Sequence, residues 1–260
     1  MKYYVVDAFT DTVFRGNPAG VCLPERELDD AVMQNIAAEN NLSETAFAVK
    51  RESCYGLRWF TPTVEVDLCG HATLGSAFAI MNYIDVNANE IRFETKSGVL
   101  TITKTGELYE LDFPARETRQ TDVTADMERA VGTAIREAYT ANAARDLLLV
   151  LENEQHVRNT IPDFNLLRSL TSHAVMITAA GNNADFVSRF FAPNMGIPED
   201  PVTGSAHTVL IPFWSGRLNM ESMVAQQLSK RGGTLFCRAC GDRVKIAGKA
   251  ALYLQGEILL

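Results

Sequence analysis

The sequence predicts an α+β fold of two similar domains, each with a sheet curled round one apolar helix. Three observations lead to this fold class. Strand-like segments are short and bounded by turns, two helix candidates are apolar on nearly every side, and the second half of the chain repeats turn positions of the first. A helix that is apolar all round must be covered on all sides, so we place each one inside a curled sheet.

Strand candidates in the first half are β-branched and separated by turn glycines. They are residues 3–7, 21–23, 44–50, 57–60, 91–94, 99–104 and 108–113. Two helices stand among them. Residues 28–41 show an amphipathic pattern that is typical of a surface helix, whereas residues 71–84 are apolar nearly all round and indicate a buried one.

The second half of the chain follows the same order. Residues 95–111 line up with residues 230–246, so that Gly98 falls on Gly233 at an offset of 135. A repeat of this length predicts two structurally related domains.

A second pair of segments supports the repeat. Residues 67–74 resemble residues 201–208, with Gly70 over Gly204 at an offset of 134, and each segment leads into a very apolar helix candidate. In both cases a loop becomes a helix at the glycine.

The domain break is expected in the stretch 114–123, which is rich in charge and hydroxyl groups. We therefore predict an N-terminal domain over residues 1–115 and a C-terminal domain over residues 116–260, whose last strand could return to the first domain. An amphipathic helix over residues 126–142 is expected to open the second half.

Composition narrows the class of partner. The chain is 47% apolar and 22% charged, with a net charge of −8 and a pI near 5.1, and it lacks the clustered Lys and Arg that nucleic acids and acidic membranes require. A small-molecule substrate is the expected partner, with no nucleic acid and no membrane. The N-terminal segment lacks the apolar core of a signal peptide, which predicts a cytoplasmic protein.

The five cysteines are odd in number and irregularly spaced, as free thiols in a reducing compartment would be. Cys237 and Cys240 form a lone C-x-x-C, and on a strand an offset of three places the two sulfurs on opposite faces. A structural zinc site needs four ligands, so we expect no metal. No dinucleotide or nucleotide motif is present, and we expect no cofactor.

The helix starts at Gly70-His71 and Gly204-Ser205 are candidate anion sites. The first backbone N–H groups of a helix lack intrahelical acceptors, and the helix dipole adds partial positive charge there. Two such starts facing one cleft would hold a carboxylate. Close helix packing explains the two glycines equally well at this point.

Three further residues could carry chemistry, each beside a simpler explanation. His71 could be a satisfied core histidine, Asp200 could be a turn or capping aspartate, and Glu44 could be a solvated acid at a strand edge. The apolar neighbours of Glu44 favour a functional role, because a carboxylate in an apolar cleft has its pKa raised toward the range useful for acid–base catalysis.

Five segments together resemble the PhzF-like family of phenazine biosynthesis. They are FRGNPAGV (14–21), NLSETAF (41–47), RWFTPTVEVDLCGHAT (58–73), EDPVTGSAH (199–207) and QLSKRGG (227–233). This resemblance implies the diaminopimelate epimerase fold, which has two similar domains, each an antiparallel sheet rolled round a central helix, and an active site in the cleft between them. A homodimer is among the expected oligomeric states.

The resemblance also implies roles for individual residues. Glu44 matches the catalytic glutamate of the family, and His71 and Asp200 match its supporting histidine and aspartate. The substrate carboxylate would be bound at the two helix starts, by the residues Gly70, Gly204 and Ser205, and Asn17 would line the cleft.

The sequence departs from the epimerases proper, which place a cysteine at each helix start as a pair of bases. Cys69 stands at the first start, but Val202 or Thr203 stands where the second thiol would be. The predicted function is therefore a cofactor-independent isomerase, in which Glu44 moves a proton on a small carboxylate-bearing metabolite. An epimerase or racemase, and a non-catalytic ligand-binding protein, are the alternatives.

Overall fold

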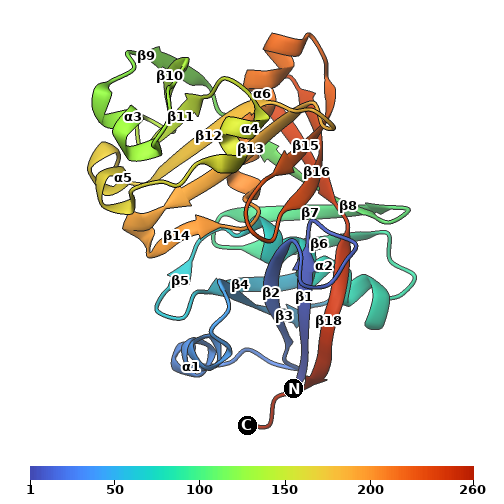
Figure 1. Cartoon of the computed structure of the whole chain (residues 1–260). Coiled ribbons are helices and arrows are strands. Elements are labelled where there is room, and N and C mark those ends of the chain that lie inside the picture. Colours follow the sequence, from blue (N-terminus) through green and yellow to red (C-terminus); the bar gives the residue numbers. More distant parts are fainter. The chain divides into compact units, whose positions relative to one another are not determined.

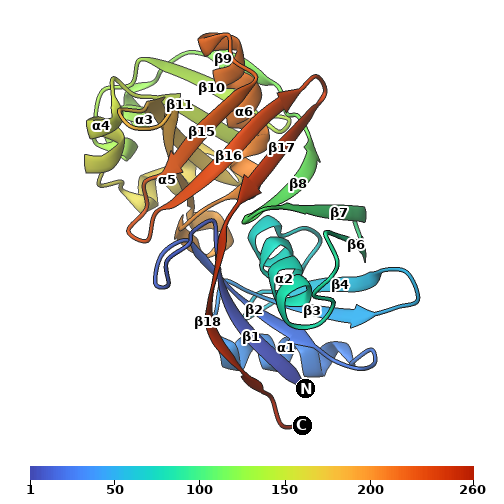
Figure 2. The same cartoon turned by 90° about the vertical axis from the view of Figure 1, so that its right-hand side faces the viewer.

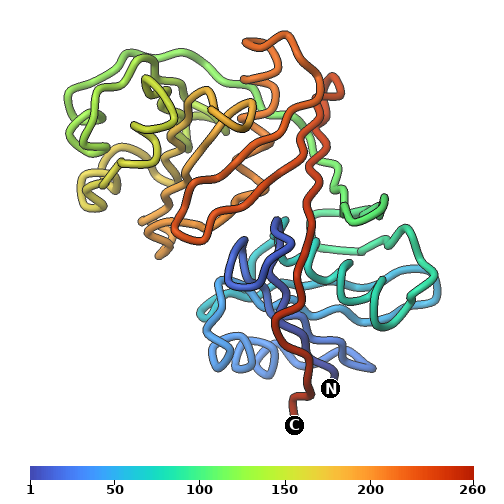
Figure 3. Tube along the Cα trace, turned by 45° about the vertical axis from the view of Figure 1, so that its right-hand side comes forward, coloured from blue at the N-terminus to red at the C-terminus, as the bar shows by residue number.

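The computed structural model describes residues 1–260, which form two compact units. Unit 1 comprises Met1–Asp112 and Ala247–Leu260, and unit 2 comprises Phe113–Ile246. Figure 1 shows that the last strand of the chain lies beside the first strand in unit 1. The two ends of the chain meet there, since the Met1 amino group donates a hydrogen bond of 2.9 Å to the backbone oxygen of Ile258 (Figure 3).

Unit 1 is a sheet with one internal and one external helix. Its elements are β1 (Lys2–Ala8), β2 (Asn17–Leu23), α1 (Asp30–Asn40), β3 (Glu44–Lys50), β4 (Tyr55–Phe60), β5 (Glu65–Val66), α2 (Gly70–Tyr83), β6 (Glu90–Thr95), β7 (Gly98–Thr105), β8 (Leu108–Pro114) and β18 (Ala250–Glu257). The strands lie in the order β18, β1, β2, β3, β4, β6, β7, β8, and β5 pairs with the end of β4.

The sheet of unit 1 curls round α2, as Figure 2 shows. Ten of the fourteen residues of α2 are buried, and the helix packs against β1, β2 and β3. On the other face of the sheet, α1 covers Phe47 and Phe60 with Met33 and Ile36. The difference between the two helices follows from sequence, because α2 is apolar nearly all round and α1 only along one stripe.

Unit 2 is built from the remaining elements. They are β9 (Thr118–Thr121), α3 (Ala125–Val131), β10 (Glu137–Ala141), β11 (Asp146–Val150), α4 (Glu154–Asn159), α5 (Phe164–Leu170), β12 (Ala174–Ala180), β13 (Phe186–Ala192), a 3₁₀ turn (Pro193–Met195), β14 (Ile197–Asp200), α6 (Gly204–Leu218), β15 (Ser222–Gln227), β16 (Gly233–Cys240) and β17 (Arg243–Gly248). The strands β9, β10, β11, β12, β13, β15 and β16 are neighbours in that order, and β14 pairs with β13.

The two units share one pairing scheme, which confirms the predicted pseudo-symmetric α+β fold. β18, β1, β2, β3, β4, β5, β6 and β7 of unit 1 correspond to β9, β10, β11, β12, β13, β14, β15 and β16 of unit 2. Each unit has an apolar helix, and these helices begin at Gly70 and Gly204. The glycine offsets in the sequence therefore reflect equivalent places in two similar sheets.

The sheets are not purely antiparallel, which corrects one detail of the expected architecture. β2 pairs with β3, and β4 with β6, in parallel, and so do β11 with β12 and β13 with β15. Helical connections separate the members of each pair. A strand that returns to its neighbour through a helix arrives in the same direction, so these pairs must be parallel.

The prediction of one helix over residues 126–142 is wrong beyond the first half of that segment. α3 ends where Gly132 adopts φ 78° and closes the last turn through a hydrogen bond from its N–H to the Glu128 carbonyl. The rest of the segment contains β10, which pairs with both β9 and β11. Sheet pairing thus overrides the amphipathic pattern in this stretch.

No helix in the chain is both long enough and apolar enough to pass through a bilayer. Cys237 is buried and Cys240 is exposed, so the two sulfurs of the C-x-x-C lie in different environments on β16. This agrees with the alternation that was expected for a strand.

Candidate active site

The parallel pair β2 and β3 brings two candidate residues to one edge of unit 1. Asn17 is the first residue of β2 and Glu44 is the first residue of β3. The start of β3 is aligned with Ala19, two residues into β2. Both side chains reach His71, which is the second residue of α2. The three residues are far apart in sequence and meet because parallel strands begin at the same edge of a sheet.

Gly16 fixes the approach of the chain to Asn17. Its φ is +62°, a conformation that side chains disfavour, and a Cβ atom there would lie 2.1 Å from the carbonyl oxygen of Ala8. Only glycine fits at this position without moving the backbone. The segment FRGNPAGV therefore contains a structural glycine immediately before a site residue.

His71 stands at the centre of the cluster. Its Nε2 lies 3.1 Å from Oε2 of Glu44, and its Nδ1 lies 3.3 Å from Nδ2 of Asn17 and 3.5 Å from Sγ of Cys69. The Glu44 contact has ion-pair distance but is not aligned as a hydrogen bond, and Oε2 is buried. The side chains of Glu44 and His71 are only 12% and 7% exposed, so their contact is largely shielded from water.

The charges of the cluster depend on one another. Burial raises the pKa of the Cys69 thiol, and the charge of Glu44 raises it further. Burial by itself would lower the pKa of His71, but negative charge on Cys69 and on Glu44 outweighs burial and raises it well above its usual value. Negative charge on either neighbour therefore favours a proton on His71.

The start of α2 also offers backbone donors. Cys69 occupies the N-cap position, and its side chain accepts no hydrogen bond from the first turn of the helix. The same holds for Thr203 at the start of α6. Both helix starts thus leave N–H groups for an external acceptor, which is the property that an anion site requires.

Unit 2 holds the other predicted residues. Asp200 ends β14 and is 9% exposed, and the hydroxyl of Thr203 donates a hydrogen bond of 2.5 Å to its Oδ2. Gly204 is buried and Ser205 is exposed at the start of α6. The prediction from the sequence that these residues and those of unit 1 serve one site stays a prediction.

Gln227 is a residue that the site prediction from sequence missed. Its buried amide donates to the Asp200 carbonyl at 2.8 Å and to the Thr203 hydroxyl at 3.1 Å, and its Oε1 accepts from the Thr203 N–H at 2.9 Å. Ser229 adds a hydrogen bond to the carbonyl of Pro201. Gln227 and Ser229 of the segment QLSKRGG therefore hold the loop that carries Asp200 in place. The sequence signal for this role is that the segment belongs to the family resemblance.

Replacing Gln227 with Ala should lower the free energy of unfolding by about 2 kcal/mol, because the buried Thr203 N–H and the Asp200 carbonyl would lose their hydrogen bonds to the Gln227 amide. Urea denaturation of Gln227→Ala measures the loss. Gln226→Ala is the matched control, since this neighbouring side chain is only partly buried. Equal stability losses in the two variants would show that the amide of Gln227 does not hold the loop.

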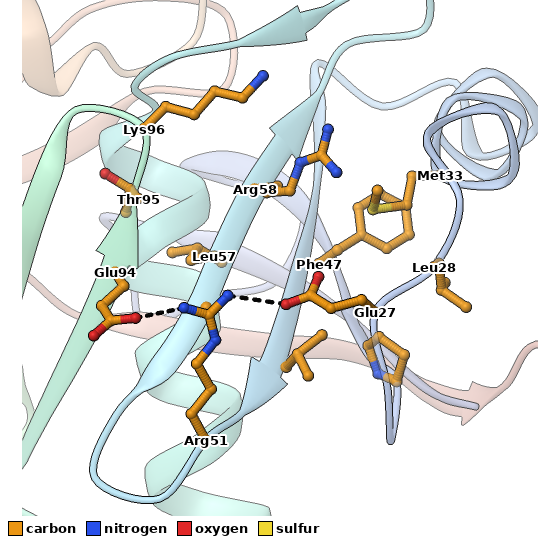
Figure 4. Close-up of a pocket in the computed structure, with 13 residues that line it drawn as sticks. Glu27, Leu28, Met33, Phe47, Arg51, Leu57, Arg58, Glu94, Thr95 and Lys96 are labelled. Atoms are coloured by element: carbon orange, nitrogen blue, oxygen red, sulfur yellow. Dashed lines mark hydrogen bonds and ion pairs between the residues drawn. The ribbon is translucent and has the colours of Figure 1, made fainter.

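A separate pocket in unit 1 contains none of the predicted site residues. It has a volume of about 380 Å³ and an apolar floor that includes Met33, Phe47 and Leu57 (Figure 4). The Arg51 guanidinium crosses it and pairs with Glu27 on one side and Glu94 on the other. All three charged side chains are about half exposed, so these ion pairs are weak restraints.

Comparison with known proteins assigns the chain to a family. The model of the phenazine biosynthesis-like proteins (PhzC-PhzF) matches residues 6–256. The chain belongs to the phenazine biosynthesis-like family. An uncharacterized isomerase of Pseudomonas aeruginosa is 46% identical to this member, with 100% of this chain and 99% of that protein covered. The chain is an isomerase, because curated relatives that match its whole length are named isomerases.

Solved structures agree with the family assignment and with the fold. The PhzF-family protein of Enterococcus faecalis is 50% identical and superposes with a TM-score of 0.96 over 100% of this chain and 99% of that one. A probable proline racemase of Agrobacterium radiobacter is only 9% identical but has a TM-score of 0.65, covering 100% of this chain and 93% of that one. The family member described here thus has an epimerase-like fold.

Proposed function

We propose that the protein is a cofactor-independent isomerase that moves a proton between two carbons of a small carboxylate-bearing metabolite. The observation that carries this proposal is the 3.1 Å contact between Glu44 and His71 beside the uncapped start of α2. It joins a base, a proton-holding imidazole and backbone donors within one unit. These are the groups that proton abstraction next to a carboxylate requires.

In the proposed mechanism, Glu44 removes a proton from a carbon that is made acidic by a carboxylate or a conjugated double bond. The anion that forms is delocalised, and the N–H groups at Gly70 stabilise it while His71 keeps its proton beside Glu44. Glu44 then returns a proton to a different carbon. The resemblance assigns Asp200, Gly204 and Ser205 to the same substrate, and we propose the α6 start as a further carboxylate ligand.

Epimerisation is the second candidate, and Cys69 favours it. The thiol lies 3.5 Å from Nδ1 of His71, so the cluster holds a second group that can carry a proton. A two-base reaction would remove the proton and return one to the same carbon. The proposed proton shift changes the position of a double bond, whereas epimerisation changes only the configuration at one carbon.

Turnover in deuterium oxide distinguishes these reactions. We expect proton NMR of carboxylate metabolites incubated with the protein to show a shifted double bond, with deuterium at the carbon that receives the proton. Deuterium confined to one stereocentre, with both configurations present and no moved double bond, would instead identify an epimerase. Tight carboxylate binding without any exchange would overturn both proposals in favour of a binding protein.

A further inference from the structure

Glu44, Cys69 and His71 present three metal-ligand atoms in one place. One oxygen, one sulfur and one nitrogen from these residues all lie within 4.8 Å of one another. Nε2 of His71 is 3.1 Å from Oε2 of Glu44 and 4.0 Å from Sγ of Cys69. All three residues belong to unit 1, and their spacing in the sequence shows no metal motif.

The separations resemble those of a tetrahedral zinc site. With Zn–N near 2.0–2.1 Å and Zn–S near 2.3 Å, ligand atoms of such a site lie roughly 3.3 Å apart for a nitrogen–oxygen pair and roughly 3.6 Å apart for a nitrogen–sulfur pair. The 3.1 Å between Glu44 and His71 is close to the nitrogen–oxygen separation of such a site. The Cys69 Sγ lies nearer Nδ1 of His71 (3.5 Å) than Nε2 (4.0 Å), so the Cys69 side chain must rotate toward Nε2 to complete the site.

Charge balance also favours a divalent cation. A thiolate and a carboxylate together carry two negative charges and the imidazole is neutral, so a complex with a divalent ion has no net charge and can be buried at lower cost than separate ions. Oε2 of Glu44 is already buried without an aligned hydrogen bond. A metal ion would give that oxygen a direct partner.

Asn17 supplies the support that a metal-bound histidine usually has. Its side-chain amide faces Nδ1 of His71 at 3.3 Å. If Nε2 binds the metal, Nδ1 carries the proton, and the amide oxygen can accept it after a rotation that exchanges the amide O and N. The Asn17 amide can therefore pair with His71 when Nε2 holds a proton and also when it holds a metal ion.

We propose that Glu44, Cys69 and His71 bind Zn²⁺ or a similar thiophilic divalent cation, which occupies the proton-transfer site and blocks it. The three side chains leave the fourth position open to water or a substrate carboxylate. Binding releases the proton of the Cys69 thiol and the proton on His71 to solvent, because metal ligands must be deprotonated. Binding is independent of the proposed isomerase activity, whereas the block on turnover rests on it.

Cobalt titration of protein stripped with a chelator tests the binding. We expect one Co²⁺ per chain, with the intense visible bands of four-coordinate Co²⁺ and a thiolate-to-cobalt charge-transfer band, and Zn²⁺ should remove both. Cys69→Ala should abolish the charge-transfer band, and Glu44→Gln should weaken Co²⁺ binding at least about tenfold. Cys240→Ala is the matched control, because that thiol is exposed and lies in unit 2.

The outcomes separate the two proposals. A charge-transfer band that survives Cys69→Ala, or that is lost in Cys240→Ala, would overturn the metal site, as would no binding by folded wild-type protein. If Cys69→Ala fails to fold, the affinity of Glu44→Gln for Co²⁺ decides by itself whether the metal site exists. Once a substrate is known, Zn²⁺ should inhibit and a chelator should restore turnover. Binding without inhibition would overturn the assigned role of Glu44 and His71, not the metal site.

Discussion

Replacing Glu44 with Gln should lower turnover by about 10²- to 10⁴-fold, while substrate binding changes little. Gln keeps the shape of the side chain and part of its hydrogen bonding, but it cannot accept and return a proton. Exchange of the substrate's carbon-bound proton with deuterium oxide should fall by the same factor. Initial rates and the exchange rate followed by NMR measure the two effects.

Glu39→Gln serves as the control for this variant. Glu39 is an exposed acid on α1, so its replacement changes the net charge equally without touching the site. Wild-type turnover by Glu44→Gln would refute the catalytic assignment. A raised KM with unchanged kcat would show that Glu44 binds the ground state instead of moving a proton.

Acidification should destabilise the protein through His207, by about 3 kcal/mol between pH 6.5 and pH 4. His207 lies on α6 and is fully buried, and burial lowers its pKa from 6.5 to about 4, against a smaller opposing effect of the Thr203 carbonyl that its Nδ1 contacts. In that pH window His207 is protonated in the unfolded chain but stays neutral in the folded chain. The stability is therefore fully present above the unfolded pKa and is lost as pH falls toward the folded one.

Urea denaturation across this pH range, with His207→Leu for comparison, measures the effect. The variant should lose most of the difference in stability between pH 6.5 and pH 4, whatever its stability at neutral pH. His71 cannot cause the same loss of stability on acidification, because its pKa is raised in the folded chain. The stability that His71 contributes is lost as pH rises above its pKa in the unfolded chain. Identical pH dependence in wild type and His207→Leu would contradict the assignment.

The fold could be predicted because its repeated parts leave regular marks in the sequence. Turn glycines and two helices without a polar face recur at nearly one offset, and each has a direct structural cause. The direction of strand pairing leaves no such mark. An apolar strand reads the same whether its neighbour is parallel or antiparallel, so the four parallel pairs could not be foreseen.

Local pattern also failed at Gly132. The residues on both sides of it have helical periodicity, and the competing strand β10 becomes favourable only when β9 and β11 are in place. Tertiary pairing therefore decides a segment that the sequence alone leaves ambiguous.

The site was predictable only in part. The resemblance named Glu44 and His71, and the structure brings them into contact. The sequence indicates Cys69 only as the counterpart of an epimerase base, and it does not single out Gln227 as a site residue. The contacts of Gln227 reach back to Asp200 across 27 residues, and no periodic pattern reports a hydrogen bond between a side chain and a distant backbone group.

The return of β18 to β1 has a consequence for synthesis of the protein. Lys2 pairs with Glu257, so one edge of the first strand lacks its partner until residue 257 has been made. At the usual 5–20 residues per second, this takes on the order of 10 to 50 seconds on the ribosome. During that time β1 exposes backbone groups that could pair with another nascent chain. Unit 1 thus cannot be completed before unit 2 has been synthesised, and removal of residues 250–257 would leave that edge open permanently.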